Sequence, residues 1–269
     1  MGGFRVRCSR IRSSVIALAM AIAVFVTSSD ASAQSLPEVA PGSVGLSSER
    51  LARVGALFES YVSDGRMTGV VVAIARDGKL AYFNALGRMD DTKDLPMTGD
   101  AIFRMASMTK HITSAAVLML YEEGHFQLED PVSRFIPELS GMKPEAQDVE
   151  EKGTREMSIL DLLIHTSGLP GNGQDPRHNQ VWTNLDLTLQ QQMAAVGIQP
   201  LAYAPGTDWR YSEATNILGY LIQVVSQQPI EAFFEERIFR PLGMVDTGFF
   251  VLEAESHRLP AVYGVNEDG

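Results

Sequence analysis

The order of the elements that the sequence predicts indicates an α+β fold, with an antiparallel sheet flanked by helices and a mainly helical region. Three observations lead to this expectation. Residues 70–75 form a β-branched run, and a tight turn then leads to a second strand-like segment. The long middle of the chain carries helical periodicity. Near the end, residues 260–265 again favour a strand.

The first 33 residues have the pattern of an export signal. Four spaced arginines precede an apolar stretch at 15–26, and Ala31-Ser32-Ala33 offers small residues for cleavage. The apolar stretch is short for a bilayer span, so we expect a cleaved leader and no stable membrane anchor. The sequence therefore predicts an exported protein, periplasmic or secreted, whose mature chain starts at Gln34.

The charge of the chain argues against a nucleic-acid partner. The net charge is −11, and losing four arginines and one aspartate with the leader would change it to −14. Such a surface repels phosphate backbones, and no basic cluster offsets it. The single cysteine, Cys8, would leave with the leader, so the mature chain depends on its core and not on disulfides.

The N-terminal elements follow from local signals. Residues 34–46, with two prolines, read as an irregular lead-in. Ser47 or Ser48 can cap a helix with an apolar stripe. Asp77-Gly78 then favours a hairpin turn between strands at 70–75 and 79–86.

The rest of the chain reads as helices joined by loops. Residues 107–123 predict a helix that ends at Gly124 and is apolar on all sides, which is typical of a buried helix. Further helices are expected over 158–165, 185–196, 215–227 and 230–239, with a polar loop over 171–182. The strand at 260–265, followed by a turn at 266–269, would need a partner. We therefore expect either an incomplete C-terminus or a sheet that closes in another way.

A serine hydroxyl becomes a nucleophile only when a base takes its proton. The chain has no G-x-S-x-G elbow, and a Ser-His-Asp set cannot be tested by spacing alone. The S-x-x-K arrangement occurs twice, at Ser107–Lys110 and at Ser140–Lys143. Glycine follows Ser140 and Pro144 follows Lys143, so the second match is expected to be a surface loop.

Ser107 opens a predicted helix, and Lys110 lies on the same face of its first turn. The positive end of the helix dipole would favour an alkoxide there. Burial disfavours a charged ammonium, so a buried Lys110 can act as a neutral base. The alternative is a capping serine beside a surface lysine.

Five stretches, in order, resemble the class C β-lactamase-like serine hydrolases, a group that includes penicillin-recognising peptidases and family VIII carboxylesterases. Residues 103–110 resemble the nucleophile region, and 163–170 resemble the family's LL-x-HTSGLP stretch. The others are 128–132, 205–212 and 241–247. The resemblance covers about residues 47–269. It implies a β-lactamase/transpeptidase-like fold, with C-terminal strands missing, and a domain at 47–269 that is incomplete at its C-terminus.

The resemblance also implies a third catalytic residue, because a family tyrosine shares the proton transfers at the serine. Tyr211 matches that position, whereas Tyr82 lies on the early hairpin and is expected to be a packing residue. Glu213 stands where many relatives have asparagine. A carboxylate cannot donate to a substrate amide and would repel a substrate carboxylate. This departure favours a neutral ester or lactone over a β-lactam.

The family's third motif, K/H-T-G or W-x-G, has no match here. The Ser107 main-chain N–H is expected to supply one oxyanion donor, and the source of the second is open. His165 belongs to a stretch that is structural in the family, and His111 is expected to be a surface or packed imidazole. Neither a metal nor another cofactor is expected.

The sequence thus predicts a serine hydrolase that cleaves a small-molecule ester or related acyl substrate through a Ser107 acyl-enzyme. Lys110 and Tyr211 would complete the catalytic set, and Glu213 would contact substrate. Two alternatives stay open. One is a β-lactamase or D-Ala-D-Ala peptidase, and the other is an inert fragment or binding protein that lacks the third motif.

Overall fold

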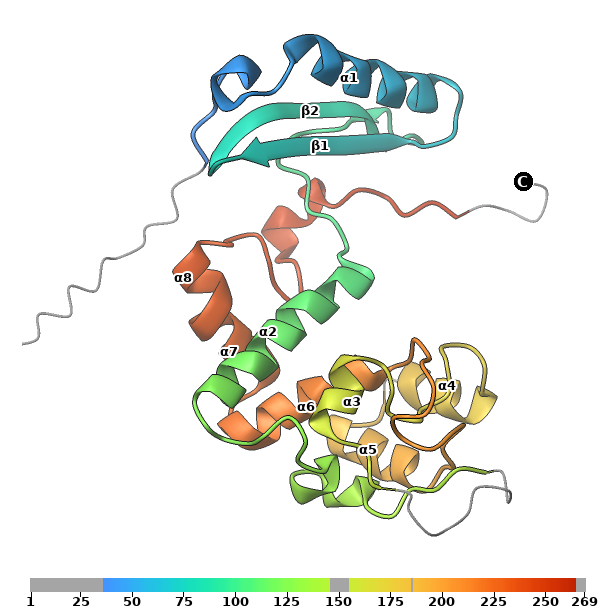
Figure 1. The fold of residues 1–269 in the computed structure, drawn as a ribbon. Helices are drawn as coiled ribbons and strands as arrows, with labels where there is room; N and C mark the ends of the chain where they lie inside the picture. Colours follow the sequence, from blue (N-terminus) through green and yellow to red (C-terminus); the bar gives the residue numbers. More distant parts are fainter. Residues whose placement is uncertain (1–35, 146–154, 185, 265–269) are drawn as a thin grey trace, which may run out of the picture. The chain divides into compact units, whose positions relative to one another are not determined.

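The computed structural model describes residues 36–145, 155–184 and 186–264, and it confirms the predicted α+β arrangement (Figure 1). The leader and the expected turn at 266–269 lie outside these residues. The helices and strands, in chain order, are α1 (Ser48–Ser63), β1 (Gly69–Arg76), β2 (Lys79–Asp90), β3 (Leu95–Pro96), α2 (Thr109–Glu122), α3 (Ile159–Leu163), α4 (Pro176–Thr183), α5 (Leu189–Gly197), α6 (Ala214–Ser226), α7 (Ile230–Phe234) and α8 (Arg240–Leu242). Short 3-10 turns and a π-helical turn (Glu235–Phe239) connect some of them.

The hairpin forms as predicted. β1 and β2 pair antiparallel, and β3 adds a short third strand to give the order β1-β2-β3. Asp77 and Gly78 both adopt positive φ, at 53° and 67°, which is the backbone of a type I′ turn. This turn matches the twist of the two strands and thereby fixes their register.

Helix α1 packs against β2, beside the hairpin (Figure 1). The Ser47 hydroxyl accepts a hydrogen bond from the Arg50 N–H at 3.3 Å, which confirms the predicted cap. A Cβ at Gly55 would come within 2.8 Å of the Tyr82 hydroxyl, so the close approach of helix and strand requires glycine there. Tyr82 is thus a packing residue of this layer, as expected.

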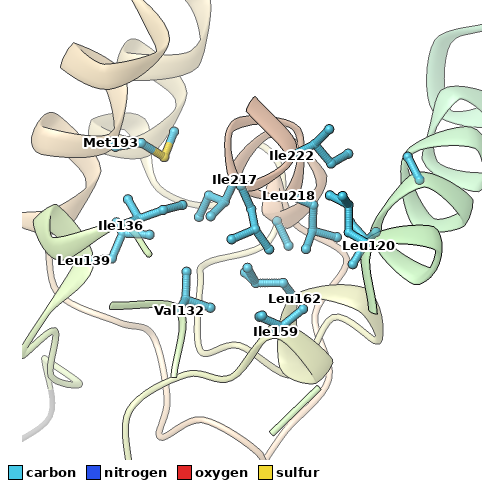
Figure 2. Packing of buried hydrophobic residues seen from close by; sticks show 14 of the residues in the cluster. Leu120, Val132, Ile136, Leu139, Ile159, Leu162, Met193, Ile217, Leu218 and Ile222 are labelled. Atoms are coloured by element: carbon cyan, nitrogen blue, oxygen red, sulfur yellow. The ribbon is translucent and has the colours of Figure 1, made fainter. Parts of the chain in front are cut away.

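The hydrophobic core of the helical region is built around α6. Figure 2 shows Ile217, Leu218 and Ile222 of this helix between Leu120 of α2 and Met193 of α5. Ile159 and Leu162 of α3 complete the same cluster, and all seven side chains are almost completely buried. Burying each such side chain contributes roughly 2 kcal/mol, so this cluster fixes the helices that carry the candidate site.

The loop predicted over 171–182 is wrong, because residues Pro176–Thr183 form helix α4. The Asp175 carboxylate accepts a hydrogen bond from the Arg177 N–H at 2.8 Å, and Pro176 occupies the first helical position. The Asp175 cap and Pro176 together start this helix, whereas the polar composition of the segment predicts a loop.

Helix α2 is buried on one face only, which corrects the expectation of burial on all sides. Thr113, Ala116, Val117 and Leu120 are buried, whereas Leu118 is 43% exposed. A short 3-10 turn (Ala106–Met108) leads into the helix. Helix α5 begins at Leu189 and not at 185, since a capping box between Thr188 and Gln191 fixes its start.

The strand predicted at 260–265 is also wrong over its described part, since residues 260–264 form no strand. The Ala261 N–H donates one hydrogen bond to the Met89 carbonyl of β2 at 2.9 Å. Pro260 has no N–H to donate, and one bond does not make a ladder. No helix within the described ranges combines the length and the apolarity needed to cross a membrane.

Candidate active site

Ser107 and Lys110 meet at the start of α2, as their spacing predicts. Ser107 lies in the 3-10 turn before the helix, and the Lys110 Nζ donates to its Oγ at 3.4 Å. The preceding residue, Ala106, has φ of 44°, in the left-handed region that residues with a side chain rarely adopt. Such strain is concentrated at functional sites. Ser107 is exposed and Lys110 is half-buried, so the amine is less enclosed than expected.

Tyr211 comes from a distant part of the chain and reaches the same place. It lies in the segment before α6, and its ring centroid is 4.6 Å from the Lys110 Nζ. Hydrogen bonds with Lys110, and next with Ser107, lower the pKa of the Tyr211 hydroxyl below its ordinary value of 10.0. The Lys110 amine therefore lies beside both the Ser107 hydroxyl and the Tyr211 ring, so that a proton can move among the three groups.

The segment that carries Tyr211 is held on both sides by backbone hydrogen bonds. The Arg210 N–H donates to the His165 carbonyl at 3.0 Å, and the Asn172 N–H donates to the Tyr211 carbonyl at 3.0 Å. The Ser212 N–H donates to His165 Nδ1 at 3.4 Å. The loop after α3 thus fixes the backbone of the tyrosine.

Asp161 in turn holds the loop after α3. Its side chain is buried, and it accepts hydrogen bonds from Arg155, from Ser158 and from the Thr166 hydroxyl at 2.8 Å. Burial alone would raise the pKa of Asp161, but these hydrogen bonds outweigh it and lower the pKa to about 2. The carboxylate therefore links the start of α3 to the loop that contains His165.

Glu213 caps α6 by position and lines a cavity beside Ser107. The cavity has a volume of about 520 Å³, and its wall includes Ser107, Lys110, Asn172, Trp182, Gln192, Glu213 and Asn216. The Glu213 Oε2 accepts a hydrogen bond from the Asn216 side chain at 3.0 Å. A larger cavity of about 690 Å³ is rich in phenylalanine and contains none of the four predicted site residues. We therefore place the candidate site in the smaller cavity.

The second S-x-x-K match lies elsewhere, in a loop. The Ser140 hydroxyl donates to a Glu156 carboxylate oxygen at 3.2 Å, and no helix of the described chain includes residues 140–143. This confirms the sequence interpretation. His111 lies exposed on α2, where its Nδ1 contacts the Met108 carbonyl at 3.3 Å.

Sequence reasoning missed two contributors to the site. Trp182 comes from α4, the helix that was read as a loop, and Asn172 from the segment before it. His165 was read as structural, yet its ring centroid lies 4.9 Å from that of Tyr211. Burial first, and the charge of Lys110 second, lower the pKa of His165 below its ordinary 6.5. Its place beside the tyrosine depends on a long-range contact that no local pattern reveals.

Comparison with known proteins matches this chain to β-lactamase-like hydrolases over most of its length. The "Beta-lactamase" family model matches residues 54–269. Esterase EstB of Burkholderia gladioli is 35% identical over 217 residues, which are 78% of this chain and 54% of EstB. The chain thus spans about half the length of the curated relatives it matches.

Solved structures agree with the family match. The structure of EstCE1, described as a hydrolase with promiscuous acyltransferase activity, superposes with a TM-score of 0.70 at 29% identity, covering 79% of this chain and 56% of EstCE1. A class C beta-lactamase gives a TM-score of 0.67 at 23% identity, with 82% and 56% coverage, which supports the fold alone. Together with the motif order and the observed site, these matches show that the chain belongs to the beta-lactamase family.

Proposed function

We propose that this chain carries the nucleophile and base of a serine hydrolase that cleaves esters through an acyl-enzyme on Ser107. The observation that carries the proposal is the meeting of three side chains. The Lys110 Nζ is 3.4 Å from the Ser107 Oγ and 4.6 Å from the centre of the Tyr211 ring. A serine with a base in reach, which a third group orients, is the arrangement that nucleophilic catalysis requires.

The Lys110–Tyr211 pair would take the Ser107 proton. Because hydrogen bonds lower the pKa of the Tyr211 hydroxyl, its deprotonated oxygen is the better-placed acceptor of the Ser107 proton, and the positive charge of Lys110 stabilises that phenolate. The Ser107 Oγ then attacks the ester carbonyl carbon, and the main-chain N–H of Ser107 serves as one oxyanion donor. When the bond to the alcohol breaks, the pair returns the proton to the leaving oxygen. Water then attacks the acyl-enzyme by the reverse proton path and releases the acid.

The charge of Glu213 favours a substrate ester that carries no negative charge near the scissile bond. Its carboxylate lines the same cavity as Ser107 and is half-buried. A substrate carboxylate there would meet a like charge in a partly desolvated place, which is unfavourable. The two named relatives, an esterase and a hydrolase with acyltransferase activity, act on acyl substrates and agree with this choice.

A fluorophosphonate probe tests the nucleophile directly. We expect labelling of the folded wild-type chain and of Ser140→Ala, the matched control from the second S-x-x-K, but none of Ser107→Ala. The inert alternative predicts no labelling of any of the three. A p-nitrophenyl short-chain ester and a chromogenic cephalosporin, assayed side by side, separate an esterase from an amide-cleaving enzyme.

We also propose that residues 1–33 direct export, that 34–46 form a lead-in and that the hydrolase domain begins near residue 47. The basic, apolar and small-residue segments of the leader support the first point. After expression in a bacterium, N-terminal sequencing of the exported protein should begin at Gln34. A cytoplasmic product that keeps Met1 would contradict the export proposal.

A further inference from the structure

His165 has a backbone conformation that the surrounding structure must maintain. Its φ is 61°, in the left-handed region, where histidine and asparagine are tolerated better than most residues. The His165 carbonyl accepts hydrogen bonds from the Arg210 N–H at 3.0 Å and from the Tyr203 hydroxyl at 3.2 Å. Hydrogen bonds from the segment that leads to Tyr211 thus hold the backbone of His165 in place.

The His165 ring contacts three residues of that segment. It lies edge-on to Trp209, with centroids 6.1 Å apart, and tilted against Tyr211, with centroids 4.9 Å apart. Its Nδ1 accepts a hydrogen bond from the Ser212 N–H at 3.4 Å. An Nδ1 that accepts carries no proton, so the neutral ring has its proton on Nε2.

We propose that neutral His165 is a positioning residue that holds the Tyr211 phenol against Lys110 and Ser107, and that protonation of His165 releases it. This positioning role rests on the proposed function, because that function assigns a proton transfer to Tyr211. His165 itself does not touch the reacting atoms.

Protonation would change the contact because an imidazolium has two donors and no acceptor. The N–H of Ser212, a completely buried residue, would lose its hydrogen-bond acceptor. The positive charge of Lys110 on α2 already acts on the ring, and Arg210, whose N–H bonds to the His165 carbonyl, has its side chain paired with Asp208.

Carboxylates do not compensate for an added charge on His165. The Asp161 carboxylate, from α3, is turned toward Arg155, Ser158 and Thr166. The other titratable groups in contact are the phenols of Tyr203 and Tyr211. A second positive charge would therefore repel Lys110 without gaining an anion.

Two substitutions distinguish the role of the aromatic ring of His165 from the role of its Nδ1 acceptor. Asparagine tolerates positive φ and offers an oxygen near the position of Nδ1, so His165→Asn keeps the acceptor and removes the titration. His165→Phe keeps an aromatic contact and removes the acceptor. We expect kcat to fall about 10²-fold in His165→Phe and less than about tenfold in His165→Asn, with KM nearly unchanged in both.

The pH profile gives a readout that a purely structural residue would not move. At pH values below the lowered pKa of His165, log kcat/KM of the wild type should rise with a slope of about two, since the His165 ring and the Tyr211 hydroxyl must each lose a proton. His165→Asn should rise with a slope of about one. A slope of one in the wild type, or two in the variant, would overturn the proposal.

A measurement without turnover keeps this test separate from the proposed function. In protein labelled with 13Cζ-tyrosine, the Tyr211 signal, assigned by its loss in Tyr211→Phe, should shift as His165 titrates, and this step should be absent in His165→Asn. A chain with no esterase activity that still shows the step would refute the function and retain the positioning. A step that persists in His165→Asn would refute the positioning.

Discussion

Ser107 and Lys110 are three residues apart and meet through helical geometry alone, whereas Tyr211 reaches them only because α6 packs against α2. The local pair is therefore robust to changes elsewhere in the molecule. The phenol depends on the segment before α6 and on the loop after α3. Substitutions in those segments should affect the proton transfer and leave the nucleophile in place.

Removing the Tyr211 hydroxyl should reduce turnover and leave stability unchanged. Tyr211 is 37% exposed, and the side-chain hydrogen bonds that lower the pKa of its hydroxyl involve Lys110 and Ser107. We expect Tyr211→Phe to lower kcat by about 10²–10⁴-fold, as loss of a general acid–base group does. Tyr82→Phe, on the hairpin, is the matched control and should keep full activity. Equal kcat in the two variants would exclude a role for Tyr211.

Neutralising Glu213 should relax discrimination against anionic substrates. With Glu213→Gln, we expect kcat/KM for an ester with a free carboxylate near the scissile bond to rise about tenfold relative to a neutral ester of the same size. Glu213→Asp retains the charge and should retain the discrimination. The measurement is the ratio of kcat/KM for the two esters, and an unchanged ratio in Glu213→Gln would show that the carboxylate does not face the substrate.

The part of the site that lies within one helical turn could be predicted from spacing, and the rest could not. Tyr211 was found only through motif resemblance, because nothing in its own neighbours indicates a contact with Lys110. His165 was assigned a structural role for the same reason. Its importance follows from ring contacts with residues more than forty positions away in sequence.

At the scale of single elements, α3 is short and depends on its cap. Ser158 and Asp161 form a reciprocal capping box, and Asp161 continues the network to Thr166. Helices of this length are unstable alone. The position of the loop after α3 therefore depends on one buried carboxylate.

Asp161→Asn should destabilise the protein, because it leaves Arg155 without its charge partner and replaces one of the two acceptor oxygens with a donor. We expect a loss of about 2 kcal/mol in the free energy of unfolding, because the Asp161 carboxylate is buried with several hydrogen bonds while Arg155 is half-exposed. Asp175→Asn is the matched control, since Asp175 also caps a helix and pairs with a half-exposed arginine, Arg177, but its carboxylate is less buried than that of Asp161, so it should cost less than about 1 kcal/mol. Urea unfolding of both variants measures the difference, and equal losses would contradict the argument.

Where element predictions succeeded, the local signal was sufficient. The Asp77-Gly78 turn and the Ser47 cap specify the hairpin and α1 without help from the rest of the chain. Prediction failed at α4, where cap and proline overrode a polar composition. It failed again at 260–264, where strand propensity had only one backbone bond to β2 to support it.

For the whole molecule, stability should fall as the pH falls, in two ranges. Burial lowers the pKa values of His165 and His178 below 6.5 in the folded state. As the pH falls below 6.5, the unfolded chain therefore binds protons at these two residues before the folded chain does, and the free energy of unfolding decreases. Asp161, with its pKa at about 2, contributes stability above pH 3.8 that is lost as the pH falls toward 2.

Urea unfolding at pH 7.5, 5.5 and 3 measures this profile. The free energy of unfolding should be highest at pH 7.5 and lowest at pH 3, and Asp161→Asn should lose less between pH 5.5 and 3 than the wild type does. Greater stability at pH 5.5 than at 7.5 would contradict the burial of the two histidines as neutral rings.

The placement of the two tryptophans of the chain has an optical consequence. Trp182 lines the cavity beside Ser107, and Trp209 lies edge-on to the His165 ring. Because an imidazolium quenches a nearby excited indole more strongly than a neutral imidazole does, intrinsic emission can follow the charge of His165 through Trp209. Emission of Trp182 would respond to occupancy of the cavity, so the unlabelled protein carries two built-in fluorescent reporters of one site.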